Sequence, residues 1–204
     1  MKWSVIIPTL WKSSRIHRLL IDLQACESVG EIILIDNAKG EKVNLSKVKH
    51  FVMEENIFVN PAWNLGVTLS ENENIAILND DVNFDTSIFE WLLTQDYGTC
   101  GMAWENYQIK ENRIYQLFEL NERPYGWGCA IFTTKTDYTH IDERLKIACG
   151  DDWLIKHSRK PMMLRGLKVE SEISTTSNLP EYGHQQYLDN KLWHTLNNKT
   201  SAEE

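Results

Sequence analysis

The stretch that decides the fold of this chain is IAILNDD, residues 75–81. Its apolar run, Ile75 to Leu78, is short enough for a buried strand, and polar and acidic residues follow it at once. Similar short apolar runs occur earlier in the chain, and each predicts a strand. They cover residues 4–7, 31–35 and 51–52.

Helical patterns alternate with these strands. Residues 15–26 carry apolar side chains at helical spacing, and Ser13 or Ser14 is placed to cap that helix. Further helices are predicted over residues 62–69 and 85–93. Because strands alternate with helices, the first half predicts an α/β fold with a mostly parallel central sheet covered by helices on both faces.

The second half of the chain predicts a small mixed β region. The expected elements are a hairpin over 107–120, a strand over 129–132, a helix over 150–160, a strand over 162–169 and a helix over 181–196. Residues 197–204 form a polar tail that we expect to be frayed. The α/β half therefore binds a ligand, and the mixed half completes the site.

Length and composition restrict the class of protein. The 204 residues, 42% of them hydrophobic, suffice for one well-buried domain, and the net charge of −8 argues against a nucleic acid or an anionic membrane as the main partner. No apolar run approaches the roughly 20 residues of a membrane helix, and no signal peptide is apparent. Four widely spaced cysteines are typical of reduced thiols, so we expect a cytoplasmic protein.

Acidic residues fall where strands end. Thr9 follows the first strand, Asp36 the second, and Asp80 with Asp81 the fourth. Ligands of open α/β sheets bind beyond the carboxyl ends of the strands, and a divalent cation would relieve the repulsion between adjacent carboxylates. The alternative is that these aspartates start a turn and cap the next helix.

A third acidic pair, Asp151 and Asp152, follows Gly150 at a predicted helix start. Aspartates at this position stabilise a helix through its dipole, which is one explanation. The other is a general base that accepts the proton of an attacking hydroxyl. The sequence leaves both open.

Seven short motifs occur in the order found in one enzyme family. They are VIIPT (5–9), LIDN (34–37), NLG (64–66), LNDDV (78–82), GWG (126–128), IDE (141–143) and GDD (150–152). From about Lys2 to Val169 the chain resembles the family-2 glycosyltransferases. That resemblance implies an inverting enzyme of the GT-A fold that uses nucleotide-activated sugars. It also implies one catalytic domain over 1–196, with a nucleotide-binding half (about 1–104) and an acceptor and catalytic half (about 105–196).

The resemblance implies a role for each matching position. It places the nucleotide beside Pro8, Thr9, Asp36, Asn64, Gly66 and Asp80. It makes Asp81 a ligand of Mn²⁺ or Mg²⁺, with His184 as a further candidate. Asp152 resembles the catalytic base and Asp151 its acidic neighbour. Trp127 and Gly128 resemble the floor under the donor and acceptor sugars.

Two positions depart from the family pattern. Asn79 replaces the first acid of the metal-binding motif, and Leu154 replaces an acid that usually follows the base. Lys156 and Arg159 are the basic residues that we expect to stabilise the leaving diphosphate.

Two other functions remain alternatives. A catalytically silent module of the same fold would bind a sugar or a partner protein. A sugar nucleotidyltransferase ranks lower, because the loop after the first strand (residues 8–14) contains no glycine. The acceptor stays open among a glycan, a lipid-linked saccharide reached by peripheral membrane association, a protein and a modified nucleobase, and homo-oligomers are also open.

Overall fold

The computed structural model describes residues 1–120, 122–172 and 180–200. Within these ranges, eight strands form the main sheet, and they are β1 (Trp3–Thr9), β2 (Val29–Asp36), β3 (Val48–Val52), β4 (Asn74–Leu78), β6 (Thr99–Met102), β7 (Gln116–Glu119), β8 (Ala130–Thr134) and β9 (Pro161–Arg165). A small second sheet pairs β5 (Asn83–Phe84) with β10 (Val169–Glu170). The helices are α1 (Arg15–Ala25), α2 (Val59–Leu69), α3 (Ile88–Leu92), α4 (Gly150–His157) and α5 (Gly183–Thr200), with 3-10 turns η1 (Trp104–Tyr107), η2 (Trp127–Cys129) and η3 (Pro180–Tyr182).

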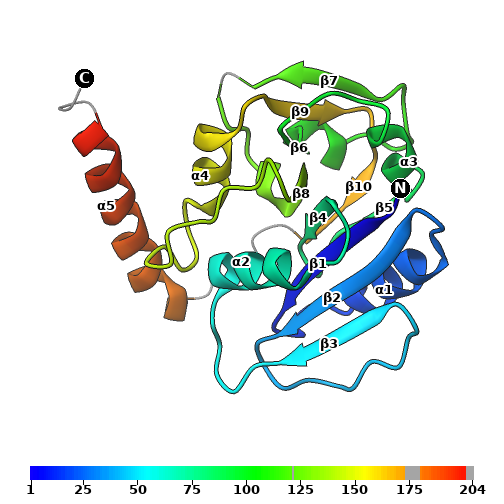
Figure 1. Ribbon diagram of the computed structural model, residues 1–204, viewed down its shortest axis with the longest axis horizontal. Coiled ribbons are helices and arrows are strands. Elements are labelled where there is room, and N and C mark those ends of the chain that lie inside the picture. Colours follow the sequence, from blue (N-terminus) through cyan, green and yellow to red (C-terminus); the bar gives the residue numbers. More distant parts are fainter. Residues whose placement is uncertain (121, 173–179, 201–204) are drawn as a thin grey trace.

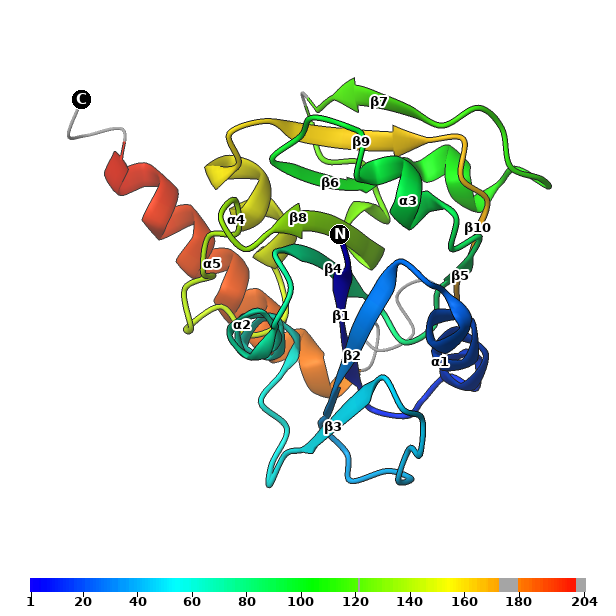
Figure 2. The same ribbon diagram turned by 45° about the vertical axis from the view of Figure 1, so that its right-hand side comes forward.

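The main sheet has the strand order β3-β2-β1-β4-β8-β6-β9-β7 (Figures 1 and 2). Strands β1 to β4 run parallel, whereas β8 lies antiparallel between β4 and β6. The predicted α/β fold with a mostly parallel sheet is therefore confirmed.

Helices cover both faces of the sheet, as predicted. Alternate residues of β1 enter different buried clusters: Val5 and Ile7 pack with α1 and α3, while Ile6 packs with α2, α4 and α5. Figures 1 and 2 place α1 and α3 on one side of the sheet and the other three helices opposite. Among the described residues, no helix is long and apolar enough to cross a membrane.

The predicted hairpin over 107–120 is wrong. Only its second arm is a strand, β7, and β7 pairs antiparallel with β9. The residues on either side of the predicted first arm bond to the end of β9 and the turn after it: the Asn106 side chain donates to Leu164 O at 2.9 Å, and Arg113 N donates to Gly166 O at 2.7 Å.

The strand predicted over 162–169 is divided into β9 and β10. Gly166, between them, has φ +91°, a backbone conformation that favours glycine and ends the strand. Strand β6 was not predicted at all.

Several helix boundaries differ by about one turn. Helix α2 begins at Val59, three residues before the predicted start, and α4 ends at His157 rather than at Lys160. Helix α5 continues to Thr200, so the first part of the expected frayed tail is helical. The remainder of that tail, 201–204, lies outside the described residues.

Candidate active site

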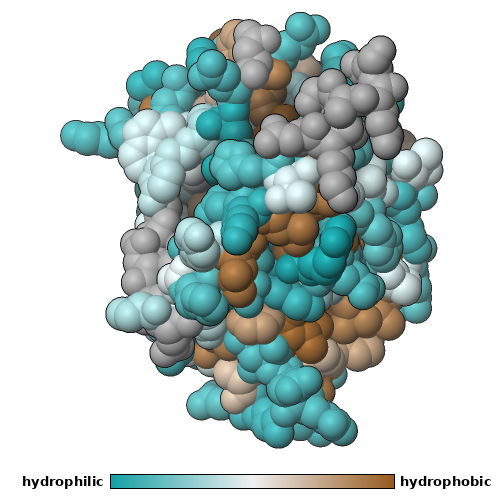
Figure 3. Space-filling view, turned by 90° about the vertical axis from the view of Figure 1, so that its left-hand side faces the viewer, coloured by the Kyte–Doolittle hydropathy of each residue, from teal (hydrophilic) through white to brown (hydrophobic). Residues whose placement is uncertain are grey.

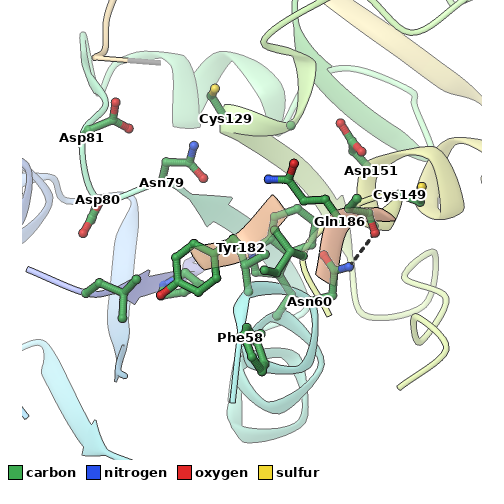
Figure 4. A pocket seen from close by; sticks show the side chains of 18 of the residues that line it. Phe58, Asn60, Asn79, Asp80, Asp81, Cys129, Cys149, Asp151, Tyr182 and Gln186 are labelled. Carbon is green, nitrogen blue, oxygen red and sulfur yellow. Dashed lines mark hydrogen bonds between the residues drawn. The ribbon is translucent and has the colours of Figure 1, made fainter. Parts of the chain in front are cut away.

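A cleft of about 470 Å³ opens beyond the carboxyl ends of β1 and β4. Its walls come from segments far apart in the sequence, which include residues 8–13, 56–63, 79–81, 123–129, 147–152 and 182–190. Figure 4 shows Asp80 and Asp81 on one side of this cleft and Asp151 across from them. The face that carries α5 is hollowed, with hydrophobic atoms visible in the hollow and mostly hydrophilic side chains around it (Figure 3).

The structure brings seven of the twelve predicted site residues to the cleft. They are Pro8, Thr9, Asp80, Asp81, Gly128, Asp151 and Asp152. The other five are Asp36, Asn64, Gly66, Trp127 and His184, and none of them lines it.

Asp80 is largely buried and is held by the turn after β1. The Thr9 hydroxyl donates to Asp80 Oδ2 at 2.6 Å, and Trp11 N donates to the same hydroxyl oxygen at 2.8 Å. Burial and the neighbouring charge of Asp81 raise the pKa of Asp80 to about 6, although the hydrogen bond from Thr9 opposes this rise. Asp80 therefore sits where a positive charge would be favourable.

This raised pKa predicts a pH-dependent stability. As the pH rises from about 4 to about 6, the unfolded chain loses the Asp80 proton first, so the free energy of unfolding falls. In the presence of EDTA, Asp80→Asn is expected to be more stable than wild type by about 2 kcal/mol near pH 7.5, and by less near pH 4.5. Urea denaturation at the two pH values measures this difference, and an equal difference at both would contradict it.

Asp81 is 5% exposed, and its Oδ2 atom accepts hydrogen bonds from Ser171 Oγ and Glu172 N, each at 2.7 Å. These bonds fix the carboxylate at the edge of the cleft. In the described part of the chain, no cluster of three or more His, Cys, Asp and Glu side chains is arranged to hold a metal ion. Asp80 and Asp81 fit a divalent cation that takes its remaining ligands from substrate phosphates and water, as Mg²⁺ usually does.

Asp151 and Asp152 occupy the first turn of α4 and share one partner, Arg123. The Arg123 guanidinium donates to Asp151 Oδ2 at 2.9 Å through one terminal nitrogen and to Asp152 Oδ1 at 2.7 Å through Nε. The Asp151 side chain is 18% exposed and that of Asp152 is 27% exposed. Burial raises the pKa of Asp151, and the attraction of Arg123 only partly offsets this effect.

Gly128 leaves room for the Asp151 carboxylate. A Cβ atom at Gly128 would lie 2.9 Å from Asp151 Oδ2, which is closer than real Cβ contacts. A side chain at this position would therefore displace Asp151 from the cleft wall.

Asp36 organises the loop after β2 instead of facing the cleft. Its carboxylate accepts hydrogen bonds from Ala38 N at 2.9 Å and Gly40 N at 2.8 Å, and it contacts His50 Nε2 at 3.1 Å. Burial alone would raise the pKa of Asp36, but these hydrogen bonds outweigh it and hold the pKa below its ordinary value.

Asn64 and Gly66 hold α2 in place. The Asn64 amide donates to Ile141 O at 2.8 Å and accepts from Ile141 N and from the Tyr138 hydroxyl. A Cβ atom at Gly66 would lie 2.3 Å from Ile6 Cγ2, so glycine lets α2 approach β1 closely. Both residues position the helix that forms one wall of the cleft.

Trp127 and His184 also lie outside the cleft lining. The Trp127 side chain is fully buried, and its indole N–H donates to Met162 O at 3.0 Å. Such a ring presents no face to a sugar, so the structure assigns it to the core. His184 is exposed near the start of α5.

The two basic residues expected beside the diphosphate are engaged elsewhere. Arg159 pairs with Asp96 and Asp137, and Lys156 Nζ donates to Asn197 Oδ1. Neither of them lines the cleft, whereas the basic side chains of Lys12 and Arg123 do.

Sequence reasoning missed Asp189, which fixes the wall that leads to α4. Asp189 is buried in α5, and its Oδ2 atom accepts hydrogen bonds from the backbone N–H groups of Lys146, Ile147 and Ala148 at 2.7–3.1 Å. A single aspartate on a mostly polar helix carries no signal of such a long-range contact.

Removing this anchor is expected to destabilise the protein. Asp189→Ala leaves three backbone donors without their acceptor, so the free energy of unfolding should fall by about 2–4 kcal/mol. Lys191→Ala, an exposed substitution on the same helix, is the matched control and should change it by less than about 0.5 kcal/mol. Urea denaturation measures both, and equal stability of the two variants would contradict the anchoring role.

Comparison with solved structures identifies the fold. Over 80% of its length, the chain matches 58% of residues 1–349 of S. aureus TarS with TM-score 0.59 and 16% identity. It matches 43% of GalNAc-T7, solved with UDP, GalNAc and Mn²⁺, over 83% of its own length with TM-score 0.59 and 12% identity. HddC from Yersinia pseudotuberculosis is matched over 89% of its length, and over 80% of this chain, with TM-score 0.53 and 17% identity.

The chain therefore has the GT-A glycosyltransferase fold. It spans less than two thirds of the TarS and GalNAc-T7 chains that it matches. No family model and no curated protein sequence matches it.

Proposed function

We propose that this protein transfers a sugar from a nucleoside diphosphate donor to an acceptor hydroxyl, with inversion at the anomeric carbon. The observation that carries the proposal is the meeting of two acidic pairs in one cleft. Asp80 and Asp81 reach it from the end of β4, and Asp151 and Asp152 reach it from the first turn of α4. The GT-A fold and the neighbours solved with UDP-GlcNAc or UDP support the same chemistry.

The first acidic pair would hold the diphosphate end of the donor. Asp81 and Asp80 supply hard oxygen ligands for Mn²⁺ or Mg²⁺, and a bound cation would neutralise charge on the leaving diphosphate. Burial and, to a smaller extent, the charge of Asp81 raise the pKa of Asp80, and a bound cation would oppose both effects. Lys12, which lines the cleft beside the turn after β1, is a basic side chain placed to attract the donor phosphates.

Asp152 would act as the general base. Its side chain is the more exposed of the second pair, so an acceptor arriving from solvent reaches it first. Arg123 contacts Oδ1, so we assign proton uptake to Oδ2. Asp152 takes the proton of the acceptor hydroxyl, the hydroxyl oxygen bonds to the anomeric carbon, and the bond from that carbon to the diphosphate breaks on the opposite side.

A binding module without catalytic activity is the second candidate. Arg123 contacts the carboxylates of both Asp151 and Asp152, so the proposed base is already engaged in an ion pair. One experiment separates the two functions. The protein is incubated with UDP-, GDP- and dTDP-linked sugars and Mn²⁺ or Mg²⁺, and release of the nucleoside diphosphate is measured. Transfer to water should release it slowly from at least one donor. Donor binding without release would favour the silent module.

A further inference from the structure

Three aromatic side chains cluster beside the cleft, and one of them, Tyr125, lines it. Trp104 and Tyr107 come from η1, and Tyr125 precedes η2. The ring centroid of Trp104 lies 5.7 Å from that of Tyr107 and 5.1 Å from that of Tyr125. We call these three residues the aromatic rim. Trp104 is 41% exposed and Tyr125 is 57% exposed, so two large rings of the rim face solvent side by side.

The rim is fixed by its inner member. The Tyr107 hydroxyl donates to Gly126 O at 2.7 Å, and Gly126 has φ +78°. A Cβ atom at Gly126 would lie 2.8 Å from the Tyr107 ring, so this glycine lets the segment that carries Tyr125 rest on Tyr107. Trp104 packs against both Tyr107 and Tyr125, so these contacts restrict the rings before a ligand arrives and reduce the side-chain freedom lost on binding.

The rim is continuous with the proposed catalytic site. Tyr125 lines the cleft itself, two residues after Arg123, whose guanidinium contacts Asp152 at 2.7 Å. A molecule seated on the rim would therefore extend toward Asp152, which in the proposed function accepts the proton of the acceptor.

We propose that the aromatic rim is the acceptor subsite and that the acceptor is a glycan, one of whose sugar rings stacks on Trp104 or Tyr125. This inference rests on the proposed function. The C–H face of a sugar ring packs against an aromatic face, while its hydroxyl groups stay available for hydrogen bonds. Amide side chains also line the cleft and suit those hydroxyls, and they include Asn60, Asn79, Gln186 and Asn190.

Charge favours a glycan over a nucleic acid, whose bases also stack on aromatic rings. Glu105 and Glu122 are exposed in the segments that carry the rim. Within residues 122–152, Arg123 is the only basic residue that lines the cleft, and it already contacts two carboxylates. A phosphate backbone would meet repulsion here, whereas a neutral sugar would not.

The test measures binding of the full chain, with UDP and Mn²⁺ present, to an array of immobilised glycans and to a single-stranded DNA oligonucleotide. We expect wild type to bind at least one glycan. Trp104→Ala and Tyr125→Ala should each weaken that binding about tenfold or more. Trp104→Phe and Tyr125→Phe, which keep an aromatic face, should restore most of it. Tyr187→Ala, at an exposed tyrosine of α5 outside the cleft, is the matched control and should leave it unchanged.

Several results would overturn the glycan subsite: no glycan bound by wild type, equal binding by the alanine variants, or binding of DNA in place of glycans. Donor hydrolysis by wild type needs no acceptor and tests the proposed function separately. Hydrolysis without glycan binding overturns only the subsite. Glycan binding that depends on the rim, without hydrolysis, overturns the transferase and leaves the rim as a glycan-binding site without an acceptor role.

Discussion

Asp152→Asn is expected to lower the rate of nucleoside diphosphate release from the donor by about 10²- to 10⁴-fold, the usual contribution of a general base. The amide keeps the shape of the side chain and an oxygen that can accept the 2.7 Å contact from Arg123, but it takes no proton from an attacking hydroxyl or water. Initial rates at saturating donor, with and without an acceptor, measure this loss.

Donor affinity separates loss of the base from loss of the fold. By calorimetry, Asp152→Asn should bind the donor nearly as tightly as wild type. Asp22→Asn is the matched control, because it removes an aspartate whose partner, Arg18, is a surface residue of α1 far from the cleft. Retained turnover in Asp152→Asn, with loss of turnover in Asp151→Asn, would move the role of base to Asp151.

Asp81→Asn is expected to weaken the Mn²⁺-dependent binding of a nucleoside diphosphate by at least about tenfold, because it removes a charged oxygen ligand. The amide oxygen keeps an acceptor for Ser171 Oγ and Glu172 N, so the local fold should persist. Calorimetry with the nucleotide that wild type binds best, in Mn²⁺ and in EDTA, measures this effect.

The comparison between Mn²⁺ and EDTA isolates the cation. In EDTA, Asp81→Asn should bind the nucleotide at least as tightly as wild type, because without the cation the Asp81 carboxylate only repels the diphosphate. An equal loss of affinity in Mn²⁺ and in EDTA would instead assign Asp81 to structural support of the cleft. It would remove the metal from the proposal.

The parallel half of the fold could be predicted because short stretches of sequence are enough to indicate each of its strands and helices. The buried strands β1, β2 and β4 are short apolar runs, and each ends in polar residues. Their order along the chain alternates with helices, and this alternation alone implies a parallel sheet. The acids that follow β4 line the cleft, which the same local pattern led us to expect.

The mixed half could not be predicted, because its pairings are long-range. The four residues of β6 pair with β8 and β9, and β7 pairs with β9 rather than with a neighbouring arm. Nothing in the local pattern of residues 107–120 distinguishes a hairpin from a loop followed by an edge strand. In this half of the chain, tertiary contacts rather than local β propensity determine which residues form strands.

Long-range contacts also explain why only some of the residues expected at the site line the cleft. Resemblance to a motif indicates a residue type at a position, but not whether the side chain is buried. Trp127 lies between two glycines and nevertheless points into the core. Arg123 and Asp189 belong to no motif, and both were found only from their contacts with distant residues.

The central claim is that Asp81 and Asp152 stand on two sides of one donor site. A crystal structure of the protein with Mn²⁺ and the nucleoside diphosphate that most raises its melting temperature tests this claim most directly. We predict that the metal ion contacts Asp81 and that the diphosphate lies in the cleft. The β-phosphate oxygen that would carry the donor sugar should face Asp152. A nucleotide bound outside this cleft, or bound within it with the diphosphate remote from Asp81, would contradict the account.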